Sequence, residues 1–495
     1  MSNQIQKITD KCLQCGTCVK ECEYLSHYCK ESPLDLTKRF LSGKLKDDIP
    51  ALFTCNLCSL CEEVCPVNLN IGTLSLELRQ EYVARNGGVS AVHKPLLDDV
   101  QKIYVSTEAK TALRGYKENF GNLKGAEIVF FPGCSLSLNS PHLVKKSFSF
   151  LQEQFPGIGI LTGCCGAPTH LIGEQTISDD IFLNFIQSVR DVGAKTIIAA
   201  CSSCVKLLKS KLPKDIRVVS LYQILEKINF SRRSGASHVF NIHDACTSRW
   251  DDLTQAAVRN IITDLGYTVE EIDHSKNLTQ CCGRGGMAAV VDDKYSATVA
   301  KRTLNEVHQD LIVYCANCRA NFSDQGARVI HLLDLIFNED WEDELAKPSL
   351  PFEESVQNLF NLKNYFEKAM RLFAYVFTAF IVKLDWGIIV KNTVLPQIKF
   401  SKDYLLNIVA ILGTTISPYL FFWQASQEVE EAIVKDKIPD IGVGKPAVSR
   451  KNVADMNWDT IIGMFFSQAI MFFIIITTAA TLQRLLALHR KQQRH

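Results

Sequence analysis

Short apolar runs rich in β-branched and aromatic residues alternate with longer helical stretches from about residue 127 to residue 337. This alternation predicts α/β units, in which parallel strands are joined by helices. Each run leads directly or almost directly into a cysteine, so we expect the thiols at strand ends, where α/β folds place their sites. The predicted strands are Glu127–Phe131, Thr196–Ala200, His238–Ile242 and Leu311–Tyr314.

The pattern differs on either side of this region. Residues 1–90 hold nine cysteines in short turns, followed by an amphipathic stretch, Thr73–Arg85, that predicts a helix ending at Gly87-Gly88. Residues 338–364 are acidic and contain prolines, which indicates a linker. We therefore expect a small, mostly α-helical domain first, then the α/β region, and a separate C-terminal part over residues 365–495.

Long apolar runs dominate the C-terminal part, at Ala369–Val382, Tyr404–Trp423 and Trp458–Leu482. The last two reach the roughly 20 residues that a helix needs to cross a bilayer, so we predict about three C-terminal transmembrane helices. The basic residues that flank these runs are balanced and fix no orientation. Because reduced thiols persist on the cytosolic side, we expect the cysteine-rich part at the cytoplasmic face of the cell membrane, anchored by these helices.

Composition changes the picture mainly through cysteine. For 495 residues two to four domains are expected, and 54 Lys+Arg against 53 Asp+Glu give no reason to expect nucleic acid as a partner. The chain has 19 cysteines, and its start, MSNQIQKITDK, has no apolar stretch that resembles a secretory signal. Disulfides are therefore disfavoured, and clustered cysteines in such a setting usually hold metal.

Two cysteine runs in the first 90 residues have identical spacing and match the two-cluster ferredoxin pattern. In that pattern three close thiolates bind one 4Fe–4S cubane and the fourth crosses to the other. The predicted ligands are Cys12, Cys15, Cys18 and Cys65 for the first cubane site, and Cys55, Cys58, Cys61 and Cys22 for the second cubane site. Zinc is the alternative, but it needs only four ligands, usually as two separated pairs. Cys29 lies outside both runs and is expected to be a small buried hydrophobe.

The α/β region repeats one cysteine pattern, which predicts two homologous domains over residues 91–232 and 233–337. Adjacent side chains in extended backbone point to opposite sides, so vicinal thiolates suit a polynuclear cluster better than one tetrahedral ion. Five cysteines in each copy also exceed the four of a structural zinc site. The first copy reads Cys134, Cys164-Cys165-Gly166 and Cys201-x-x-Cys204, and the second reads Cys246, Cys281-Cys282-Gly283 and Cys315-x-x-Cys318.

At the motifs FFPGC, CCGAP, CSSC, HDAC, CCGRGG and CANC the chain resembles the CCG (cysteine-rich) domain family. That family includes heterodisulfide reductase catalytic subunits and the iron–sulfur subunits of glycolate oxidase and anaerobic glycerol-3-phosphate dehydrogenase. The resemblance implies one or two further iron–sulfur clusters, of the noncubane 4Fe–4S kind. It implies a first CCG site at Cys134, Cys164, Cys165, Cys201 and Cys204, and a second CCG site at Cys246, Cys281, Cys282, Cys315 and Cys318. Zinc at one of the two sites stays an open alternative.

The second CCG site has candidate proton donors beside it. His243 and Asp244 precede Cys246, and Arg284 follows the vicinal pair Cys281-Cys282. We predict that this site faces the substrate, with Cys281, Cys282, His243 and Asp244 as catalytic residues, because a catalytic cluster needs a proton source. The alternative is that the histidine, the aspartate and the arginine are polar groups satisfied at a strand end.

Residues from about Ala369 to Leu482 resemble a consecutive stretch of the Nramp family of divalent-metal transporters, in segments such as ILGTTISPYLFFWQASQEVEE. Transport needs inverted repeats around a midplane site, and only about three spans of the larger transporter are expected in this stretch. The resemblance therefore implies an anchor or a fusion artefact rather than transport by this chain alone.

The leading hypothesis is an iron–sulfur oxidoreductase subunit that passes electrons between the cubanes and the CCG sites, in heterodisulfide, thiol or glycolate-type 2-hydroxy-acid metabolism. The sequence has no Gly-x-Gly-x-x-Gly motif, so the expected partners are a flavoprotein subunit, a membrane cytochrome b or a quinone, together with a small redox substrate. One alternative is an electron-conduit subunit of a flavoprotein or quinone-linked dehydrogenase. Another is a membrane metal-transporter fragment with a metal-sensing head.

Overall fold

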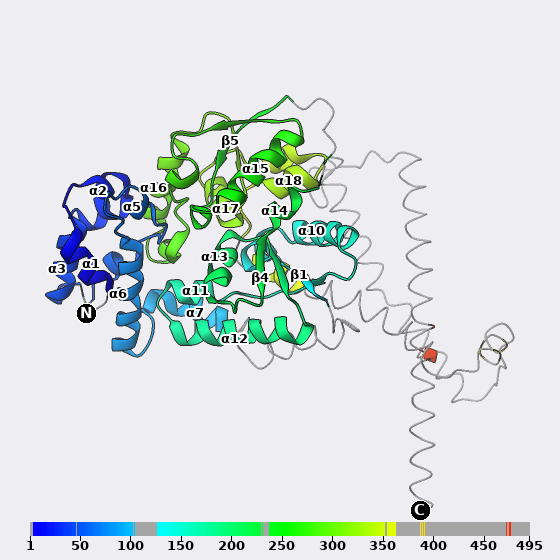
Figure 1. The fold of residues 1–495 in the computed structure, drawn as a ribbon, viewed down its shortest axis with the longest axis horizontal. Coiled ribbons are helices and arrows are strands. Elements are labelled where there is room, and N and C mark those ends of the chain that lie inside the picture. Colours follow the sequence, from blue (N-terminus) through cyan, green and yellow to red (C-terminus); the bar gives the residue numbers. More distant parts are fainter. Residues whose placement is uncertain are drawn as a thin grey trace, which may run out of the picture. The chain divides into compact units, whose positions relative to one another are not determined.

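A computed structural model describes residues 3–45, 47–101, 103, 126–228, 230, 237–351 and 354–362, with isolated positions at 387, 389, 391, 472, 475 and 476. The chain divides into two units, residues 1–368 and residues 369–495. All the helices and strands given below belong to the first unit, which holds an N-terminal helical domain and two α/β halves (Figure 1).

The N-terminal domain is built from short helices, several of which begin at polar caps. They are α1 (Asn3–Lys11), α2 (Thr17–Glu21), α3 (Pro33–Leu41), α4 (Ile49–Phe53), α5 (Leu60–Glu63) and α6 (Ile71–Asn86), with a π-helical turn at Leu25–Cys29. The side chains of Ser32, Asp48 and Asn70 accept backbone N–H groups at the starts of α3, α4 and α6. Gly87, in the left-handed conformation at φ 67°, ends α6. The helix predicted over Thr73–Arg85 is therefore confirmed.

Each α/β half contains a four-stranded parallel sheet, and the strand order is the same in both. The first sheet has the order β2-β1-β3-β4 and the second β6-β5-β7-β8. The strands are β1 (Ile128–Phe131), β2 (Gly159–Ile160), β3 (Thr196–Ala199), β4 (Arg217–Ser220), β5 (Val239–His243), β6 (Thr268–Glu271), β7 (Asp310–Val313) and β8 (Val329–His331). The four predicted strands are the four central ones, so the duplicated α/β architecture is confirmed.

Helices join the strands of each half. In the first half and the segment leading to it they are α7 (Lys94–Val100), α9 (Cys134–Asn139), α10 (Pro141–Gln154), α11 (Ala167–Leu171), α12 (Gln175–Val192), α13 (Ser202–Lys211) and α14 (Leu221–Leu225). In the second half they are α15 (Asp252–Asp264), α16 (Asp293–Leu304), α17 (Ala316–Asp324) and α18 (Leu332–Phe337). Short 3-10 turns are η2 (Ala91–His93), η4 (Cys246–Ser248), η5 (Lys276–Leu278), η6 (Gly285–Val290) and η7 (Trp341–Glu344).

The two halves share one hydrophobic core. Phe130 of the first sheet and Phe240 of the second belong to the same buried cluster, to which α10, α14 and α15 also contribute. The hydroxyl of Tyr222 donates a hydrogen bond of 3.0 Å to the carbonyl oxygen of Tyr314. Both faces of each sheet are covered, which explains why the central strands read as continuous apolar runs.

Part of the predicted linker packs on the second half. Trp341 is buried, its ring lies against Phe240 and Tyr267, and its indole N–H donates to the Tyr267 hydroxyl over 3.0 Å. Leu345 and Leu362 are buried as well. The segment after α18 therefore adds apolar contacts to the core of the second half.

The expected transmembrane helices, and with them the expected anchoring at the cell membrane, are corrected. In the part of the chain that the structure describes, no helix has the length and apolar character needed to cross a bilayer. The predicted runs Ala369–Val382 and Tyr404–Trp423 lie outside the described residues, and so does Trp458–Leu482 apart from three positions.

Candidate iron–sulfur centres

The four cysteines predicted for the first cubane site line one cavity in the N-terminal domain, together with Pro33, Val67 and Leu69. The loop around this cavity turns back on itself, because Gln14 and Gly16 have left-handed backbone at φ 51° and 77°. Cys15 is the exposed member of the set, and its sulfur lies 3.4 Å from the hydroxyl of Thr17. The cysteines of this cavity are Cys12, Cys15, Cys18 and Cys65.

The four cysteines predicted for the second cubane site line a second cavity, and they are Cys22, Cys55, Cys58 and Cys61. Leu57 and Ser59 have left-handed backbone at φ 53° and 63°. They stand two and four residues after the first cysteine of their run, as Gln14 and Gly16 do in the other run. The identical spacing therefore folds into the same local loop twice. The expected burial of the Cys29 side chain falls outside what the structure describes.

The distances between the sulfur atoms can be compared with those of a tetrahedral zinc site. A tetrahedral zinc ion with Zn–S bonds of about 2.3 Å would bring its sulfurs to within about 4 Å of one another. Among the described residues, the only three metal-binding side chains with ligand atoms all within 4.8 Å of one another are His142, Asp334 and Glu344. No three described cysteines are that close, although the sulfurs of Cys165 and Cys204 form a pair at 3.4 Å, so the described thiols form no compact set for a tetrahedral ion.

The first CCG site brings its five cysteines together from three segments of the first half. Cys134 begins α9 after β1, and Cys201 precedes α13 after β3. Gly133 makes the approach possible, since a Cβ there would lie 3.0 Å from the Cβ of Cys201 and 3.1 Å from the sulfur of Cys204. The vicinal thiols have different further partners: Cys164 packs in a cluster with Cys134, whereas the sulfur of Cys165 lies 3.4 Å from that of Cys204.

The second CCG site repeats this arrangement in the other half. Cys281 packs with Cys246 and with the cysteines of the second cubane site, whereas Cys282 packs with Cys318 and Cys315. The backbone N–H of Gly283 donates to the sulfur of Cys281 over 3.4 Å, as Gly166 does to Cys164. Hydrogen bonds of this kind are usual around iron–sulfur clusters.

Burial sets the electrostatics of these thiols. It raises the pKa of Cys18 to about 11, with the neighbouring Cys65 as the next cause, and it raises the pKa of Cys22 well above its ordinary value. Hydrogen bonds from Cys281 and Cys318 lower the pKa of Cys282. Such buried thiols can all be thiolates together only when a cation binds them and displaces their protons. The all-sulfur donor sets therefore fit iron–sulfur clusters.

The second CCG site adjoins the second cubane site. Cys281 lines the same cavity as Cys55 and Cys58. The side-chain amide of Asn56 donates to the carbonyl oxygens of Gly283 and Gly285, at 2.9 Å and 3.2 Å. No sequence pattern marked Asn56, because its partners are more than 220 residues away.

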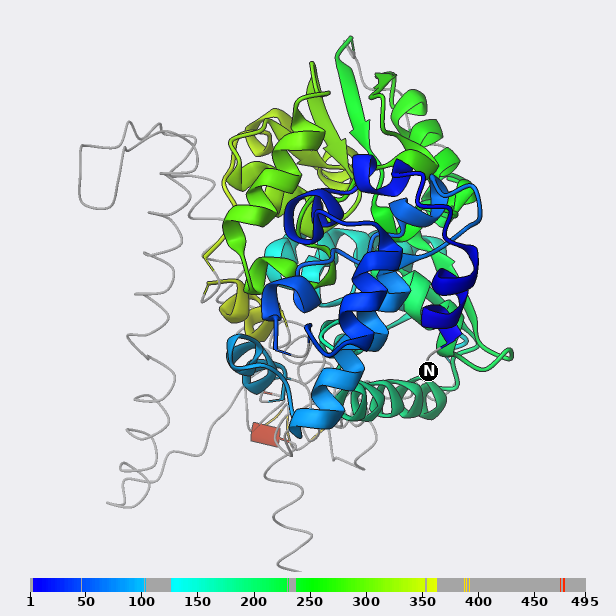
Figure 2. The same ribbon diagram turned by 90° about the vertical axis from the view of Figure 1, so that its left-hand side faces the viewer.

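Arg79 is a second residue that the sequence reasoning missed. Its side chain is fully buried, and its guanidinium joins all three parts of the first unit. It donates to the carbonyl oxygens of Cys55 at 2.7 Å, Leu171 at 2.6 Å and Gly286 at 2.8 Å. Figure 2 shows the N-terminal helices, in blue, in front of the two α/β halves that Arg79 ties to them. Nothing in the sequence around Arg79 marks it, because two of these three partners belong to segments far away in the chain.

Most polar side chains near Cys246 already have hydrogen-bond or ion-pair partners. Nε2 of His243 lies 3.0 Å from the carbonyl oxygen of Gln280, and its buried Nδ1 has no hydrogen-bond partner among the described residues. Asp244 is fully buried and forms a two-bond ion pair with Arg259 at 2.8 Å and 3.0 Å. It also accepts the backbone N–H of Lys276. Arg284 is paired with Asp324 at 2.6 Å.

Comparison with known families agrees with this geometry. Residues 11–70 match the 4Fe-4S dicluster domain, and residues 128–209 and 240–323 each match the cysteine-rich domain. The chain carries a 4Fe–4S dicluster domain and two cysteine-rich domains. Residues 368–493 match the natural resistance-associated macrophage protein-like family, so the Nramp resemblance of the C-terminal part is confirmed as a similarity of sequence.

Relatives of this chain include components of redox enzymes. The chain is 22% identical to a subunit of the CoM/CoB fumarate reductase of Methanothermobacter marburgensis, over 66% of this chain and 72% of that protein. It is 24% identical to a subunit of the dihydromethanophenazine:CoB–CoM heterodisulfide reductase of Methanosarcina barkeri, over 64% of this chain and 88% of that protein. It is 22% identical to the EtfAB:quinone oxidoreductase of Syntrophomonas wolfei, over 48% of this chain and 36% of that protein. The chain is thus related, distantly, to iron–sulfur components of oxidoreductases.

Proposed function

We propose that this chain is an iron–sulfur subunit of an oxidoreductase, in which electrons pass between the two cubane sites and the second CCG site, where a thiol or disulfide substrate reacts. The observation that supports the proposal best is that the second cubane site and the second CCG site meet at one cavity. Cys281 of the second CCG site lines the cavity of Cys55, Cys58 and Cys61. A redox centre at either site would have the other as its immediate neighbour.

The proposal includes an iron–sulfur cluster at all four sites, with cubanes at the first two. The all-sulfur donors and the N–H groups directed at sulfur support it. A bound cluster supplies one-electron transfer, and the protein holds it and limits its contact with water. The rival reading, zinc at one CCG site, would need four of the five sulfurs there to close into a tetrahedron.

The residues around the second CCG site have separate tasks in this proposal. Asp244 positions the loop before Cys281, because it binds Lys276 N–H and its own carbonyl oxygen accepts the Thr279 hydroxyl at 2.8 Å. His243 is the candidate for passing a proton on: its Nε2–H donates to the carbonyl oxygen of Gln280, and Nδ1, which is not engaged by a described residue, can take up a proton and hand it to the substrate. Reduction of a disulfide to two thiols consumes two electrons and two protons, so the proton supply has to match the electron supply.

The substrate class and the partner rest on the relatives. The names of two relatives contain CoM and CoB, and one of those is a heterodisulfide reductase subunit, which favours a thiol–disulfide couple. The third name joins an electron-transfer flavoprotein to quinone, which favours a flavoprotein or a quinone-linked partner. Cys15 and Leu13 are exposed, which supports an exchange of electrons between the first cubane site and such a partner.

The test is the metal content of protein purified and handled without oxygen. We expect brown protein with iron and labile sulfide well above about eight of each per chain, the content of two cubanes, and reduced 4Fe–4S signals by electron paramagnetic resonance. Cys58→Ser should remove one cubane signal and leave the other, whereas the control Cys29→Ser should keep both. Colourless protein after reconstitution with iron and sulfide would contradict the proposal, and zinc without sulfide at a CCG site would contradict the cluster assigned there.

A further inference from the structure

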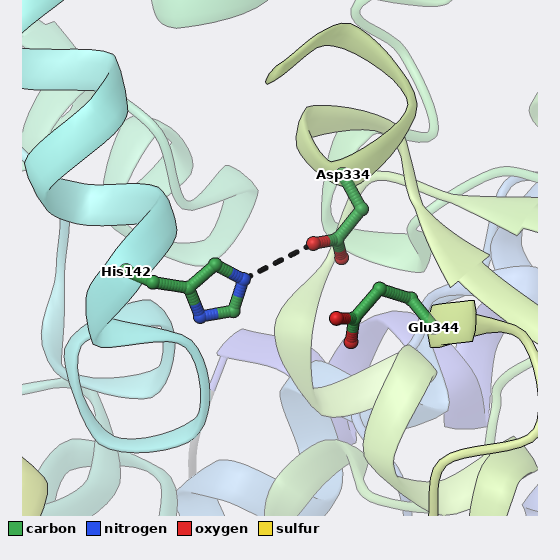
Figure 3. A group of neighbouring side chains, drawn as sticks. All are labelled: His142, Asp334 and Glu344. Atoms are coloured by element: carbon green, nitrogen blue, oxygen red, sulfur yellow. Dashed lines mark hydrogen bonds and ion pairs between the residues drawn. The ribbon is translucent and has the colours of Figure 1, made fainter. Parts of the chain in front are cut away.

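We propose that His142, Asp334 and Glu344 form a binding site for one divalent first-row metal ion at the junction of the two α/β halves. The site is separate from the cysteine sites and uses no sulfur. His142 belongs to α10 of the first half, whereas Asp334 belongs to α18 and Glu344 to η7, which follow the second sheet. Figure 3 shows the imidazole and the two carboxylates directed into one space.

The three side chains are already at ligand distance. One ligand atom from each lies within 4.8 Å of the other two, and Nε2 of His142 is 3.2 Å from an oxygen of Asp334. The side chain of Asp334 is 4% exposed, that of Glu344 19% and that of His142 46%. The site is therefore anchored by a buried carboxylate and opens to solvent at the imidazole, which gives an ion a path of entry.

The internal repeat provides a control within the same chain. Thr254 stands eight residues after Cys246, as His142 stands eight residues after Cys134. Gln223 and Asp334 are both the third residue of a helix that directly follows the last strand of a half. In the equivalent contact Gln223 donates to the Thr254 hydroxyl over 2.9 Å, a neutral pair. Gln223 also donates to a carboxylate oxygen of Asp251 over 3.1 Å. The equivalent contact thus contains no histidine, and the pairing of an imidazole with a carboxylate at these two positions occurs only in the His142–Asp334 contact.

The charges at the site favour a cation. Two carboxylates that approach this closely repel each other when both are ionised, and the repulsion is strongest for the buried Asp334. Asn338 donates to Asp334 over 2.7 Å, which is a neutral contact. Lys347 reaches Glu344 over 2.8 Å, but its side chain is 55% exposed. A divalent ion would neutralise both carboxylates, and the exposed lysine can then turn outward to solvent.

The donor set identifies the class of ion. One imidazole nitrogen with two carboxylates suits borderline and hard divalent ions of the first row, such as Mn²⁺, Fe²⁺ or Zn²⁺, whereas the thiolate sites select softer binding. Because α10 and α18 come from different halves, an ion bound here would hold the two halves together. Its binding free energy would then add to the stability of the junction.

The test uses Mn²⁺ alone, because it prefers oxygen and nitrogen ligands and leaves cysteine sites undisturbed. Anaerobic protein with its clusters is titrated at room temperature, and the paramagnetic resonance signal of free Mn²⁺ is followed. We expect one equivalent to bind to the native chain, and binding at least about tenfold weaker in His142→Gln and in Asp334→Asn. The control is Glu127→Gln, which removes an exposed carboxylate outside the group and should bind as the native chain does.

Two variants are used so that a loss of metal binding can be distinguished from a loss of folding. His142 is half-exposed, so His142→Gln should keep the circular dichroism and the cluster absorbance of the native chain even if Asp334→Asn does not. One bound equivalent that is lost in a folded His142→Gln supports the site. No binding by the native chain at millimolar Mn²⁺, or equal binding by the native chain and His142→Gln, would overturn it.

Discussion

The side-chain amide of Asn56 donates a hydrogen bond of 2.9 Å to the carbonyl oxygen of Gly283, directly after the vicinal cysteines of the second CCG site. The other atom of that amide, its oxygen, accepts the hydroxyl of Tyr295 over 3.2 Å. This buried contact fixes the loop of the second cubane site against the second α/β half. It gives the proposed electron path a structural basis, and it can be disturbed at one residue.

Gly285→Ala is expected to disturb this contact. A Cβ at position 285 would lie 2.5 Å from the carbonyl oxygen of Asn56 and 3.0 Å from the sulfur of Cys281, so one of the two loops has to move. Overpacking of this kind typically costs about 1–3 kcal/mol of stability. We expect slower transfer of electrons from the cubanes to the second CCG site, measured by stopped-flow reduction with a dye.

Gly88→Ala is the matched control for that variant. A Cβ at position 88 would meet no atom within 4 Å, and its backbone is not left-handed, so the substitution should change neither stability nor transfer. If Gly285→Ala transfers electrons as fast as Gly88→Ala, the close approach of the two loops is not what couples the sites.

Cys282→Ala should abolish turnover while both cubanes stay reducible by dithionite. Cys282 belongs to the second CCG site and, unlike its neighbour Cys281, does not line the cavity of the second cubane site. Turnover is measured with viologen dye and a disulfide substrate, and the cubanes by paramagnetic resonance. A variant with full activity would move the chemistry away from the second CCG site.

Cys165→Ala decides whether the second CCG site acts alone. Cys165 occupies the position in the first half that Cys282 occupies in the second, and it has the same kind of partner, since its sulfur lies 3.4 Å from that of Cys204. If the second CCG site carries the chemistry, this variant should keep most of the activity. Equal loss in both variants would show that the substrate needs the two sites together.

The spacing of the cysteines predicted much of the site because ligands close in sequence fold locally. The two ferredoxin-type runs form equivalent loops, with left-handed residues at Gln14 and Leu57. The first three cysteines of each run line one cavity and the fourth lines the other, as the spacing indicated. The central strands were predictable for a similar reason, since they are buried on both faces. The outer strand β6, with the sequence TVEE, is largely exposed and has no such apolar signal.

Contacts between distant parts of the chain were not predictable. Asn56 and Arg79 act on residues of the α/β halves, and only the docking of the domains brings those partners within reach. The ion pair of Asp244 with Arg259 could not be predicted either, because no spacing rule links the two residues, and its presence favours the alternative that Asp244 is a polar group satisfied at a strand end. The apolar runs of the C-terminal part predicted membrane spans from length and hydropathy alone, and the described residues contain none.

Arg79→Met should lower the reduction potential of one cubane. The guanidinium lies beside Cys55, so its charge favours the more negative, reduced form of a cluster at the second cubane site. Arg79→Lys keeps the charge and should shift the potential less. Loss of the donor also leaves several buried carbonyl oxygens without a partner, so we expect destabilisation of about 3 kcal/mol or more. A redox titration followed by paramagnetic resonance checks this, and equal potentials in both variants would contradict it.

His93 should make the protein less stable as the pH falls below about 6.5. Its ring is fully buried between Phe53 and the Ser90 hydroxyl, and burial, with the nearby charge of Arg79, lowers its pKa to about 4. In the unfolded chain the pKa is about 6.5, so between these two values the unfolded state binds the proton more readily. The stability contributed by the neutral ring is complete above pH 6.5 and is lost as the pH falls toward 4, by up to about 1.4 kcal/mol per pH unit.

Urea unfolding of the anaerobic holoprotein at pH 7.5, 6.5 and 5.5 measures this loss. The native chain is compared with variants of single histidines, so a pH effect that all of them share, such as release of the clusters, cancels. His93→Gln removes the titrating group, so its free energy of unfolding should fall less with decreasing pH than that of the native chain, by a difference of about 1 kcal/mol between pH 7.5 and 5.5. His27→Gln, at an exposed histidine, should follow the native chain. Parallel pH profiles for the native chain and His93→Gln would mean that the buried imidazole takes up its proton without opening the fold.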